Sequence, residues 1–196
     1  MTALVDSLVR AAGAIAPHRP FAIVGGLAVS IRAEPRLTRD CDFAVSVDND
    51  QEAEDLIRAL ATSGYVAITL VEQEKTGRLA TARLQLAADE GRFVDLLFAS
   101  SGIEPEVVDQ ATVEPISRSV SLPVASVGHL MAIKLLARDD RRRPQDADDL
   151  SNLRDIATAA DWDTAADAVA LIMERGYARG RDLTGSLKLL RTKGAY

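Results

Sequence analysis

Hydrophobic and polar residues follow two different periods along this chain, and each period predicts one kind of element. Apolar residues three or four positions apart predict amphipathic helices, whereas short apolar runs bounded by turn residues predict strands. In the first half of the chain this criterion predicts helices over residues 2–16, 27–33 and 50–63. It also predicts strands over residues 21–24, 40–47, 65–72, 79–87 and 93–98.

The pattern changes in the second half of the chain. Residues 104–123 predict a short helix and then an extended segment over residues 116–122. From Ser126, a residue suited to capping a helix, the spacing is almost entirely helical. Helices are predicted over residues 127–138, from residue 144, and over residues 164–175 and 181–190.

These elements predict an α/β (α+β) fold in which helices flank a mixed sheet. We expect an α/β core over residues 1–123 and a helical C-terminal part over residues 124–196 that packs on the core. A chain of 196 residues is long enough to bury one such core.

Composition excludes several classes of protein. No apolar run is long enough to span a bilayer, and the first twenty residues carry Asp6 among their apolar positions, unlike a signal peptide. The single cysteine, Cys41, allows no internal disulfide and is expected in the core. With only His18 and His129 beside it, the usual zinc sites are also excluded. We therefore expect a cytoplasmic protein.

Charge argues against a protein that binds nucleic acid through its overall charge, because the net charge is −6. The arginines are nevertheless unevenly distributed. One group surrounds the segment around residue 36, and a second lies near residue 140, so a local basic surface remains open; these groups are Arg32, Arg36 and Arg39, and Arg138 with Arg141, Arg142 and Arg143.

The segment from Gly25 to Asp42 carries the first candidate chemistry. A short strand runs into Gly25-Gly26, where the backbone can approach another group closely. Asp40 and Asp42 lie on the same face of the next strand, because side chains alternate along a strand. Two neighbouring carboxylates repel each other unless a cation lies between them, which suits magnesium. The alternative is that both are solvated loop residues.

Asp95 is a third candidate acid. It is the only charged residue in the apolar run from Phe93 to Phe98. Burying an ionised carboxylate there would cost several kcal/mol unless it is paired or bound to a metal. A strand edge that faces solvent would also tolerate it. Beside Asp40 and Asp42, we favour the metal interpretation.

The helical half contains a second set of candidates. Lys134 interrupts an apolar stretch and either lies on the polar face of its helix or neutralises a phosphate. Asp146 and Asp149 lie in the first turns of a helix opened by Pro144. Acids at that position often cap a helix or stabilise its dipole, so this interpretation stays open for both.

Together these motifs resemble a known superfamily. Gly25-Gly26, thirteen intervening residues and then Asp-Cys-Asp-Phe resemble the signature of the DNA polymerase β-like nucleotidyltransferases. Lys134, then Arg138, then Gln145-Asp146-x-x-Asp149-Leu150, resemble the C-terminal motif of their AbiEii branch, which includes MenT-type toxins. Gln145 departs from the family pattern, which often has a lysine or arginine there.

The resemblance implies a function and a set of site residues. It implies a nucleotidyltransferase that moves a nucleoside monophosphate from a nucleoside triphosphate to an acceptor, with the 3′ end of transfer RNA as the leading candidate. It also implies a toxin with a cognate antitoxin. The implied magnesium ligands, for two ions, are Asp40, Asp42 and Asp95; the implied catalytic residues of the helical part are Lys134 and Asp146; the implied nucleotide-binding residues are Gly25, Gly26, Lys134 and, as helpers, Ser30 or Arg39.

Three alternatives remain at this point. The acceptor could be a protein hydroxyl, as in AMPylation. The same acids could serve a metal-dependent nuclease or phosphatase, which would release nucleotides or phosphate. A non-catalytic binding subunit could keep the fold without turnover, although the presence of all three acids argues against it.

Overall fold

The computed structural model describes residues 2–87, 91–139 and 144–193. Its first part contains α1 (Thr2–Ile15), β1 (Phe21–Val24), α2 (Gly25–Arg32), β2 (Cys41–Val45), α3 (Asp50–Thr62), β3 (Tyr65–Glu72), β4 (Leu79–Leu86) and β5 (Val94–Leu97). Then follow α4 (Glu104–Asp109), β6 (Thr112–Pro115), β7 (Ser121–Val124), α5 (Val127–Ala137), α6 (Gln145–Ile156), α7 (Ala159–Glu174) and α8 (Leu183–Lys193).

The described strands form one seven-stranded sheet in the order β3-β4-β5-β2-β1-β7-β6. Strand β2 runs parallel to β5, and β1 runs parallel to β7, whereas the other neighbouring strands are antiparallel. The predicted mixed sheet is therefore confirmed. The candidate residues of the first half lie in or next to its central strands: Gly25 follows β1, Asp42 lies in β2 and Asp95 lies in β5.

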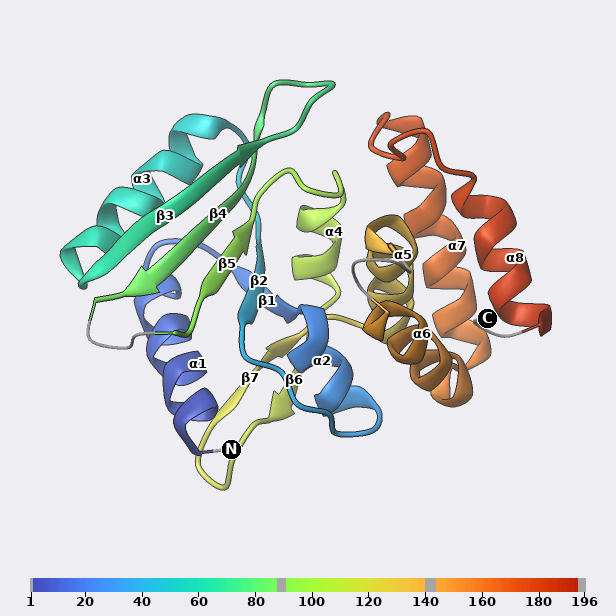
Figure 1. Ribbon diagram of the computed structural model, residues 1–196, viewed down its shortest axis with the longest axis horizontal. Helices are drawn as coiled ribbons and strands as arrows, with labels where there is room; N and C mark the ends of the chain where they lie inside the picture. The colour runs from blue at the N-terminus through green and yellow to red at the C-terminus, as the bar shows by residue number, and fades with distance from the viewer. Residues whose placement is uncertain (1, 88–90, 140–143, 194–196) are drawn as a thin grey trace.

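Helices cover both sides of the sheet (Figure 1). Helices α1 and α3 lie on one side, and α4 lies on the other, toward the C-terminal helices α5 to α8. The core contains side chains from the sheet and from α1 and α3, among them Leu8, Ile23, Phe43, Leu56 and Leu96, each at most 2% exposed. Burial of these apolar side chains is the main stabilising contribution.

Most of the predicted elements are present. Cys41 is buried, as expected, and the side chain of Ser126 caps α5 by accepting a hydrogen bond from the backbone N–H of His129. Helix α7 ends before Gly176, whose φ of 81° is a conformation that glycine adopts without strain.

Two predictions about element boundaries are wrong. The extended segment expected over residues 116–122 is extended only at residues 121 and 122, which belong to β7. Residues 116–120 form the turn between β6 and β7, closed by a hydrogen bond of 2.8 Å from the N–H of Ile116 to the carbonyl of Val120. Helix α7 begins at Ala159 and not at residue 164, because Thr158 and Asp161 form a capping box there. The extra turn, Ala-Ala-Asp-Trp-Asp, contains no buried residue, so the spacing of apolar residues gave no helical signal there.

The predicted division of the chain between residues 123 and 124 stays a prediction. Strand β7 runs through Val124, and helices α5 to α8 follow it without a further strand in the part that the structure describes. Helix α2 packs against both α5 and α6, so the glycine turn is in direct contact with the helical layer. Within the described ranges no helix is long and apolar enough to cross a membrane.

Candidate active site

The register of two parallel strands brings two of the candidate acids side by side. Asp42 in β2 is paired with Asp95 in β5, and on its other side Asp42 is paired with Val24 at the end of β1. Neighbouring strands lie about 4.8 Å apart, so paired side chains on one face are in close proximity. Asp40 lies just before the first residue of β2, two positions from Asp42 and on the same face.

Arg83 is the cation nearest to these acids, and the sequence analysis missed it. It lies in β4 directly opposite Asp95. Its guanidinium donates two hydrogen bonds to the Asp95 carboxylate, at 2.8 and 2.6 Å, and lies 3.6 Å from Asp40. Its pKa is raised mainly by the hydrogen bonds to Asp95 and further by the negative charges of Asp95, Asp40 and Asp42, although burial opposes the shift.

The surroundings of Asp95 exclude one of the two interpretations given for it. Its side chain is only 13% exposed, and β5 lies inside the sheet. The interpretation that Asp95 lies on a strand edge facing solvent is therefore wrong. Arg83 neutralises the carboxylate, which explains how a charge is tolerated in an apolar run. Metal binding by Asp95 stays a prediction.

Each glycine of the Gly25-Gly26 pair meets a side chain of the site. Gly25 has a φ of +68°, and a Cβ built on it would overlap the carboxylate of Asp42. A Cβ built on Gly26 would overlap the guanidinium of Arg36. Glycine is therefore needed at both positions to let Asp42 and Arg36 approach the start of α2.

Lys134 forms the centre of a second cluster, in the helical layer. The residue is 8% exposed, and its ammonium group donates to Asp146 at 2.8 Å and lies 2.7 Å from Asp149. Lys134 is therefore a buried, paired cation, and its alternative as a lysine on a solvated helix face is wrong. The two aspartates are also buried, at 3% and 0%, and their carboxylates contact Lys134, so neither is simply a helix cap.

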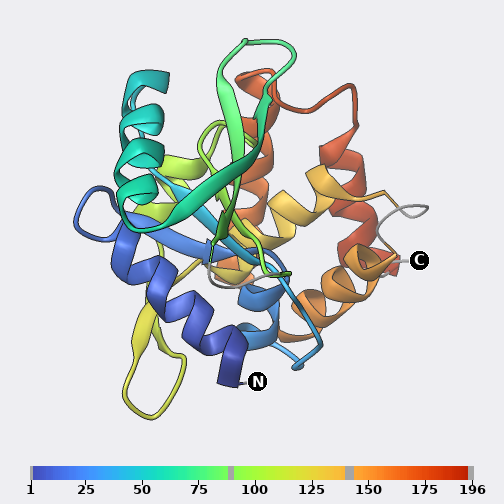
Figure 2. The same ribbon diagram turned by 60° about the vertical axis from the view of Figure 1, so that its left-hand side comes forward.

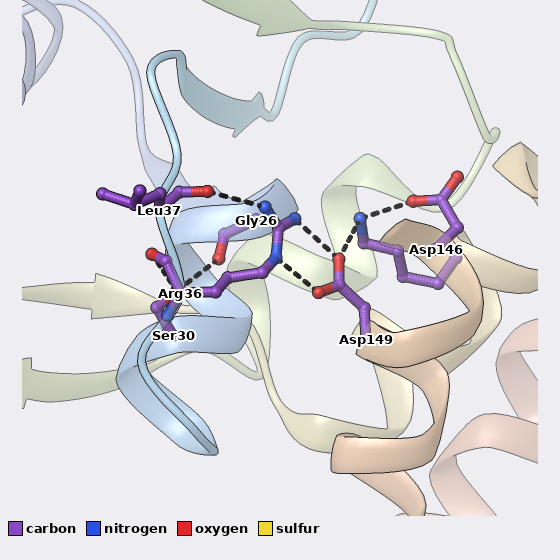
Figure 3. A network of polar contacts seen from close by, with 7 residues as sticks. Gly26, Ser30, Arg36, Leu37, Asp146 and Asp149 are labelled. Carbon is purple, nitrogen blue, oxygen red and sulfur yellow. Dashed lines mark hydrogen bonds and ion pairs between the residues drawn. The ribbon is translucent and has the colours of Figure 1, made fainter. Parts of the chain in front are cut away.

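Arg36 extends the second cluster toward the start of α2 (Figure 3). Its guanidinium donates to both oxygens of Asp149, at 2.6 and 2.8 Å, and to the carbonyl of Leu37 at 3.1 Å. The hydrogen bonds to Asp149 are the main cause of its raised pKa, with burial opposing them and the charges of Asp149, Asp146 and Asp42 adding to them. The charge of Asp42 thus contributes to the raised pKa of Arg36, while hydrogen bonds to Asp149 in α6 hold the guanidinium in place.

One oxygen of Asp146 has no partner. Its Oδ1 accepts from Lys134, whereas its buried Oδ2 has no hydrogen-bond partner in the part of the chain that the structure describes. Leaving a buried carboxylate oxygen unsatisfied costs free energy. In Figure 3 the Asp146 carboxylate lies at the end of the network that begins at Arg36.

The remaining candidates lie in different surroundings. The hydroxyl of Ser30 donates to the carbonyl of Gly26 at 3.0 Å, and Arg39 is exposed in the loop before β2. Arg32 is bound to Glu114 at 2.5 Å, away from the acids, and Arg138 caps the end of α5. The predicted basic group at residues 141–143 lies outside the described residues.

The donor set suits a hard divalent cation. Asp40, Asp42 and Asp95 would supply carboxylate oxygens, the ligands that Mg²⁺ prefers. Among residues 2–87, 91–139 and 144–193, however, no three acidic, histidine or cysteine side chains are arranged to hold a metal. Arg83 hydrogen-bonds both oxygens of one of these acids, Asp95. The residues fit magnesium in chemistry, with Arg83 supplying the positive charge in this conformation.

The structure contains a cleft of about 600 Å³. It lies between the turn of the β3–β4 hairpin and the segment that joins α7 to α8, two regions that lie close together in both views (Figure 2). Thr81 lines the cleft and lies two residues before Arg83 in β4, hence on the same face of the sheet. The residues that line the cleft include none of the predicted site residues, and the cleft reaches the strand face of Arg83 through Thr81.

A comparison with protein families gives a match over almost the whole chain. The family model described as nucleotidyl transferase AbiEii toxin, type IV toxin–antitoxin system, matches residues 7–193. A search of curated proteins found no significant match.

Similar folds occur among solved structures. An antigenic nucleotidyltransferase-like protein from Paracoccidioides brasiliensis is 17% identical, with a TM-score of 0.53 over 94% of this chain and 92% of that one. The lincosamide antibiotic adenylyltransferase LnuA is 14% identical, with a TM-score of 0.47 over 80% and 98% of the two chains. The nucleotidyltransferase toxin MenT4 from Mycobacterium tuberculosis is 15% identical, with a TM-score of 0.39 over 97% and 93%. The first of these supports the fold.

Proposed function

Because the chain belongs to the AbiEii family of nucleotidyl transferase toxins, we propose that it transfers a nucleoside monophosphate from a nucleoside triphosphate to the 3′ end of transfer RNA. The observation that carries the proposal is the pairing of Asp42 with Asp95, with Asp42 against Gly25 and Arg36 against the neighbouring Gly26. Arg36 is in turn bound to Asp149, which also contacts Lys134. Acids and cations that face one another from two layers suit a triphosphate, which needs both metal ligands and counter-charges.

The chemistry follows from a simple balance of bonds. An oxygen of the acceptor hydroxyl forms a bond to the α-phosphorus of the nucleotide, and the bond from that phosphorus to the bridging oxygen of the β-phosphate breaks. Pyrophosphate leaves with that electron pair, and the hydroxyl proton passes to a base. Asp40, Asp42 and Asp95 would hold two magnesium ions, which when bound supply charge neutralisation and activation of the acceptor hydroxyl.

Lys134 is suited to binding a phosphate oxygen. An ammonium group has three N–H donors, and Asp146 and Asp149 account for two of them. Among the residues that the structure describes, Asp146 and Asp149 are the two acids in contact with the ammonium, so the third donor can contact the triphosphate. Because the two carboxylates hold the lysine in place, its position requires no reorganisation during the reaction, which is the basis of electrostatic catalysis by fixed groups.

Asp146 is suited to binding a hydroxyl. Its Oδ2 is buried and has no partner in the described part of the chain, so it can accept a hydrogen bond from a substrate group. A ribose hydroxyl of the nucleotide or of the RNA terminus has the required donor. Asp146 would thereby position a substrate while its Oδ1 continues to hold Lys134.

The acceptor and the partners come from the family and not from a bound ligand. A toxin of this family implies a nucleoside triphosphate as substrate and a cognate antitoxin. Transfer RNA is the acceptor that we propose because addition to its 3′ end would block aminoacylation and stop translation. Expression is then expected to arrest growth when Asp42 is intact and to be harmless in Asp42→Asn.

A labelling experiment tests this proposal. The protein is incubated with each of the four labelled nucleoside triphosphates, magnesium, and either total cell RNA or total cell protein. We expect label on RNA of transfer RNA size with the wild type and none with the double variant Asp40→Asn, Asp42→Asn. Label on a protein band alone would overturn the RNA acceptor and support AMPylation. Release of nucleotides or phosphate without transfer would instead support a nuclease or phosphatase, and full activity of the double variant would end the metal-acid mechanism.

A further inference from the structure

Arg83 contacts two members of the acid cluster formed by Asp40, Asp42 and Asp95, whereas an ordinary ion pair joins one cation to one acid. Its guanidinium contacts both oxygens of Asp95 and also approaches Asp40. The same guanidinium lies 5.0 Å from the centroid of the Phe93 ring and makes a cation–π contact with it. One arginine therefore serves two of the three acids that the proposed function assigns to metal binding.

The physical need for such a cation is clear when no metal is bound. Three carboxylates near one another repel, and the repulsion raises the free energy of the folded chain unless a positive charge is present. Arg83 is close enough to Asp95, Asp40 and Asp42 for all three to raise its pKa. A guanidinium is always protonated, so this neutralisation does not depend on pH in the physiological range.

The contact also conflicts with metal binding. A carboxylate whose two oxygens both accept hydrogen bonds from one guanidinium has its most favourable lone-pair directions in use. A divalent cation at Asp95 would in addition repel the arginine at short distance. The guanidinium and the metal therefore compete for Asp95.

The arginine is able to move away. Its side chain is 38% exposed, and Thr81 beside it on the same strand face lines the open cleft. The pair formed by Arg36 and Asp149 differs, because Asp149 is fully buried and is also bound to Lys134. Arg36 is less free to move, so among the described residues the Arg83 pair is the one that combines a bidentate contact, a metal-ligand candidate and a route to solvent.

We propose that Arg83 is the internal counter-ion of the acid cluster, which holds Asp95 in the metal-free protein and must release it before a divalent cation binds. The proposal rests on the proposed function, because it takes Asp40, Asp42 and Asp95 as the metal ligands. Arg83 is accordingly a positioning residue that sets the metal affinity of the site. Since the two cations compete, removing one must strengthen the binding of the other.

Calorimetric titration with Mn²⁺ tests the proposal without any nucleotide or acceptor. Four proteins are compared: wild type, Arg83→Gln, Arg83→Lys and Arg58→Gln. Arg58 is the matched control, because it contacts the carboxylates of Glu54 and Asp55 on the exposed face of α3, with its side chain 59% exposed. Arg83→Lys keeps the charge but loses the planar pair of donors.

We expect the Kd for Mn²⁺ to fall on the order of tenfold in Arg83→Gln, to fall less in Arg83→Lys, and to stay unchanged in Arg58→Gln. Thermal unfolding gives an independent readout. Without metal, Arg83→Gln should unfold at a lower temperature than the wild type, and Mn²⁺ should raise its Tm by more than it raises that of the wild type. If Arg83→Gln fails to fold, Arg83→Lys carries the same comparison.

An unchanged or weaker Mn²⁺ affinity in both Arg83 variants overturns the proposal. Asp42→Asn is titrated as a fifth protein: if it loses Mn²⁺ binding while both Arg83 variants bind no more tightly than the wild type, the role of Arg83 alone fails and the metal site stays in place. If none of the proteins binds Mn²⁺, both the counter-ion role and the metal ligands fail. Nucleotide transfer in the labelling experiment then still decides the proposed reaction separately.

Discussion

The space where Gly25 would carry a side chain is taken by the carboxylate of Asp42. Gly25 is the first residue of α2, and its φ of +68° is one that other residues adopt only with strain. The turn between β1 and α2 therefore closes around an acid of the candidate active site. The sequence predicts that Gly25 binds phosphate, and in the fold the absence of a side chain at Gly25 also leaves room for Asp42.

Gly25→Ala should consequently damage both stability and activity. The new methyl group overlaps the Asp42 carboxylate and adds backbone strain, so we expect a loss of unfolding free energy of about 2–4 kcal/mol and a large drop in transfer. Two control variants separate the causes. Gly77→Ala has a similar φ of +67° with no atom near the new methyl, so it should lose only about 1 kcal/mol, whereas Gly13→Ala in α1 should be neutral or slightly stabilising. Equal stabilities of the Gly25 and Gly77 variants, measured by chemical denaturation, would contradict the overlap.

Lys134→Ala should abolish transfer and also destabilise the protein. Removing the ammonium leaves the buried carboxylate of Asp146 without its partner, which costs about 3 kcal/mol, and removes a counter-charge for the triphosphate. Lys188, exposed in α8, is the matched control, and Lys188→Ala should change stability by less than about 0.5 kcal/mol. Turnover is measured at a temperature at which thermal unfolding shows both variants folded. Wild-type turnover in Lys134→Ala would remove this residue from the site.

Asp149→Asn should have one of the largest effects on stability of any single change in α6. Asp149 is fully buried and is the common partner of Arg36 and Lys134, so the variant leaves two cations with too little negative charge. We expect a loss of about 3–5 kcal/mol in unfolding free energy. Asp148→Asn is the control, because Asp148 is exposed in the same helix and should change stability by less than about 0.5 kcal/mol. Similar denaturation midpoints for the two variants would refute the importance of the buried contact.

His129 should make stability depend on pH. Burial lowers the pKa of His129 in the folded protein below its ordinary value of 6.5, against a smaller opposing effect from the charge of Glu106. The folded state therefore binds fewer protons than the unfolded state, and stability is lost as the pH falls from about 6.5 through the lowered pKa. His129→Gln should remove this contribution. Unfolding free energies of the two proteins from pH 8 to pH 5 check it, and curves that stay parallel would contradict it.

The helices and strands show how far local patterns predict this fold. Strand β3 spans Tyr65–Glu72 and β1 spans Phe21–Val24, as their apolar runs predict. The failures are also local in origin. The first turn of α7 contains no buried residue and so carries no apolar period. The turn between β6 and β7 has Ser117, Arg118 and Ser119 at its centre, without the glycine, proline or asparagine that marks most hairpin turns. In both places capping and hydrogen bonding decided what periodicity did not indicate.

The candidate site likewise contains residues that the sequence predicts and one that it does not. Asp40, Asp42, Asp95, Lys134 and Asp146 were named from spacing and resemblance, and the fold places Asp42 beside Asp95 and Lys134 beside Asp146. Arg83 was missed although it occupies a polar position of its strand, alternating with the buried Ala82 and Leu84. That alternation gives the face on which Arg83 lies but not the residue opposite it.

The sequence by itself determined the identity of most elements, the faces of the strands and the family of the chain, because periodicity, turn residues and short motifs are properties of neighbouring positions. The tertiary structure alone decided which charges meet. Arg83 faces Asp95 across a strand pair, and Arg36 reaches Asp149 over more than a hundred residues of chain. Such pairings depend on strand register and on the packing of α2 against α6, which are set by burial of the whole core and not by any local stretch.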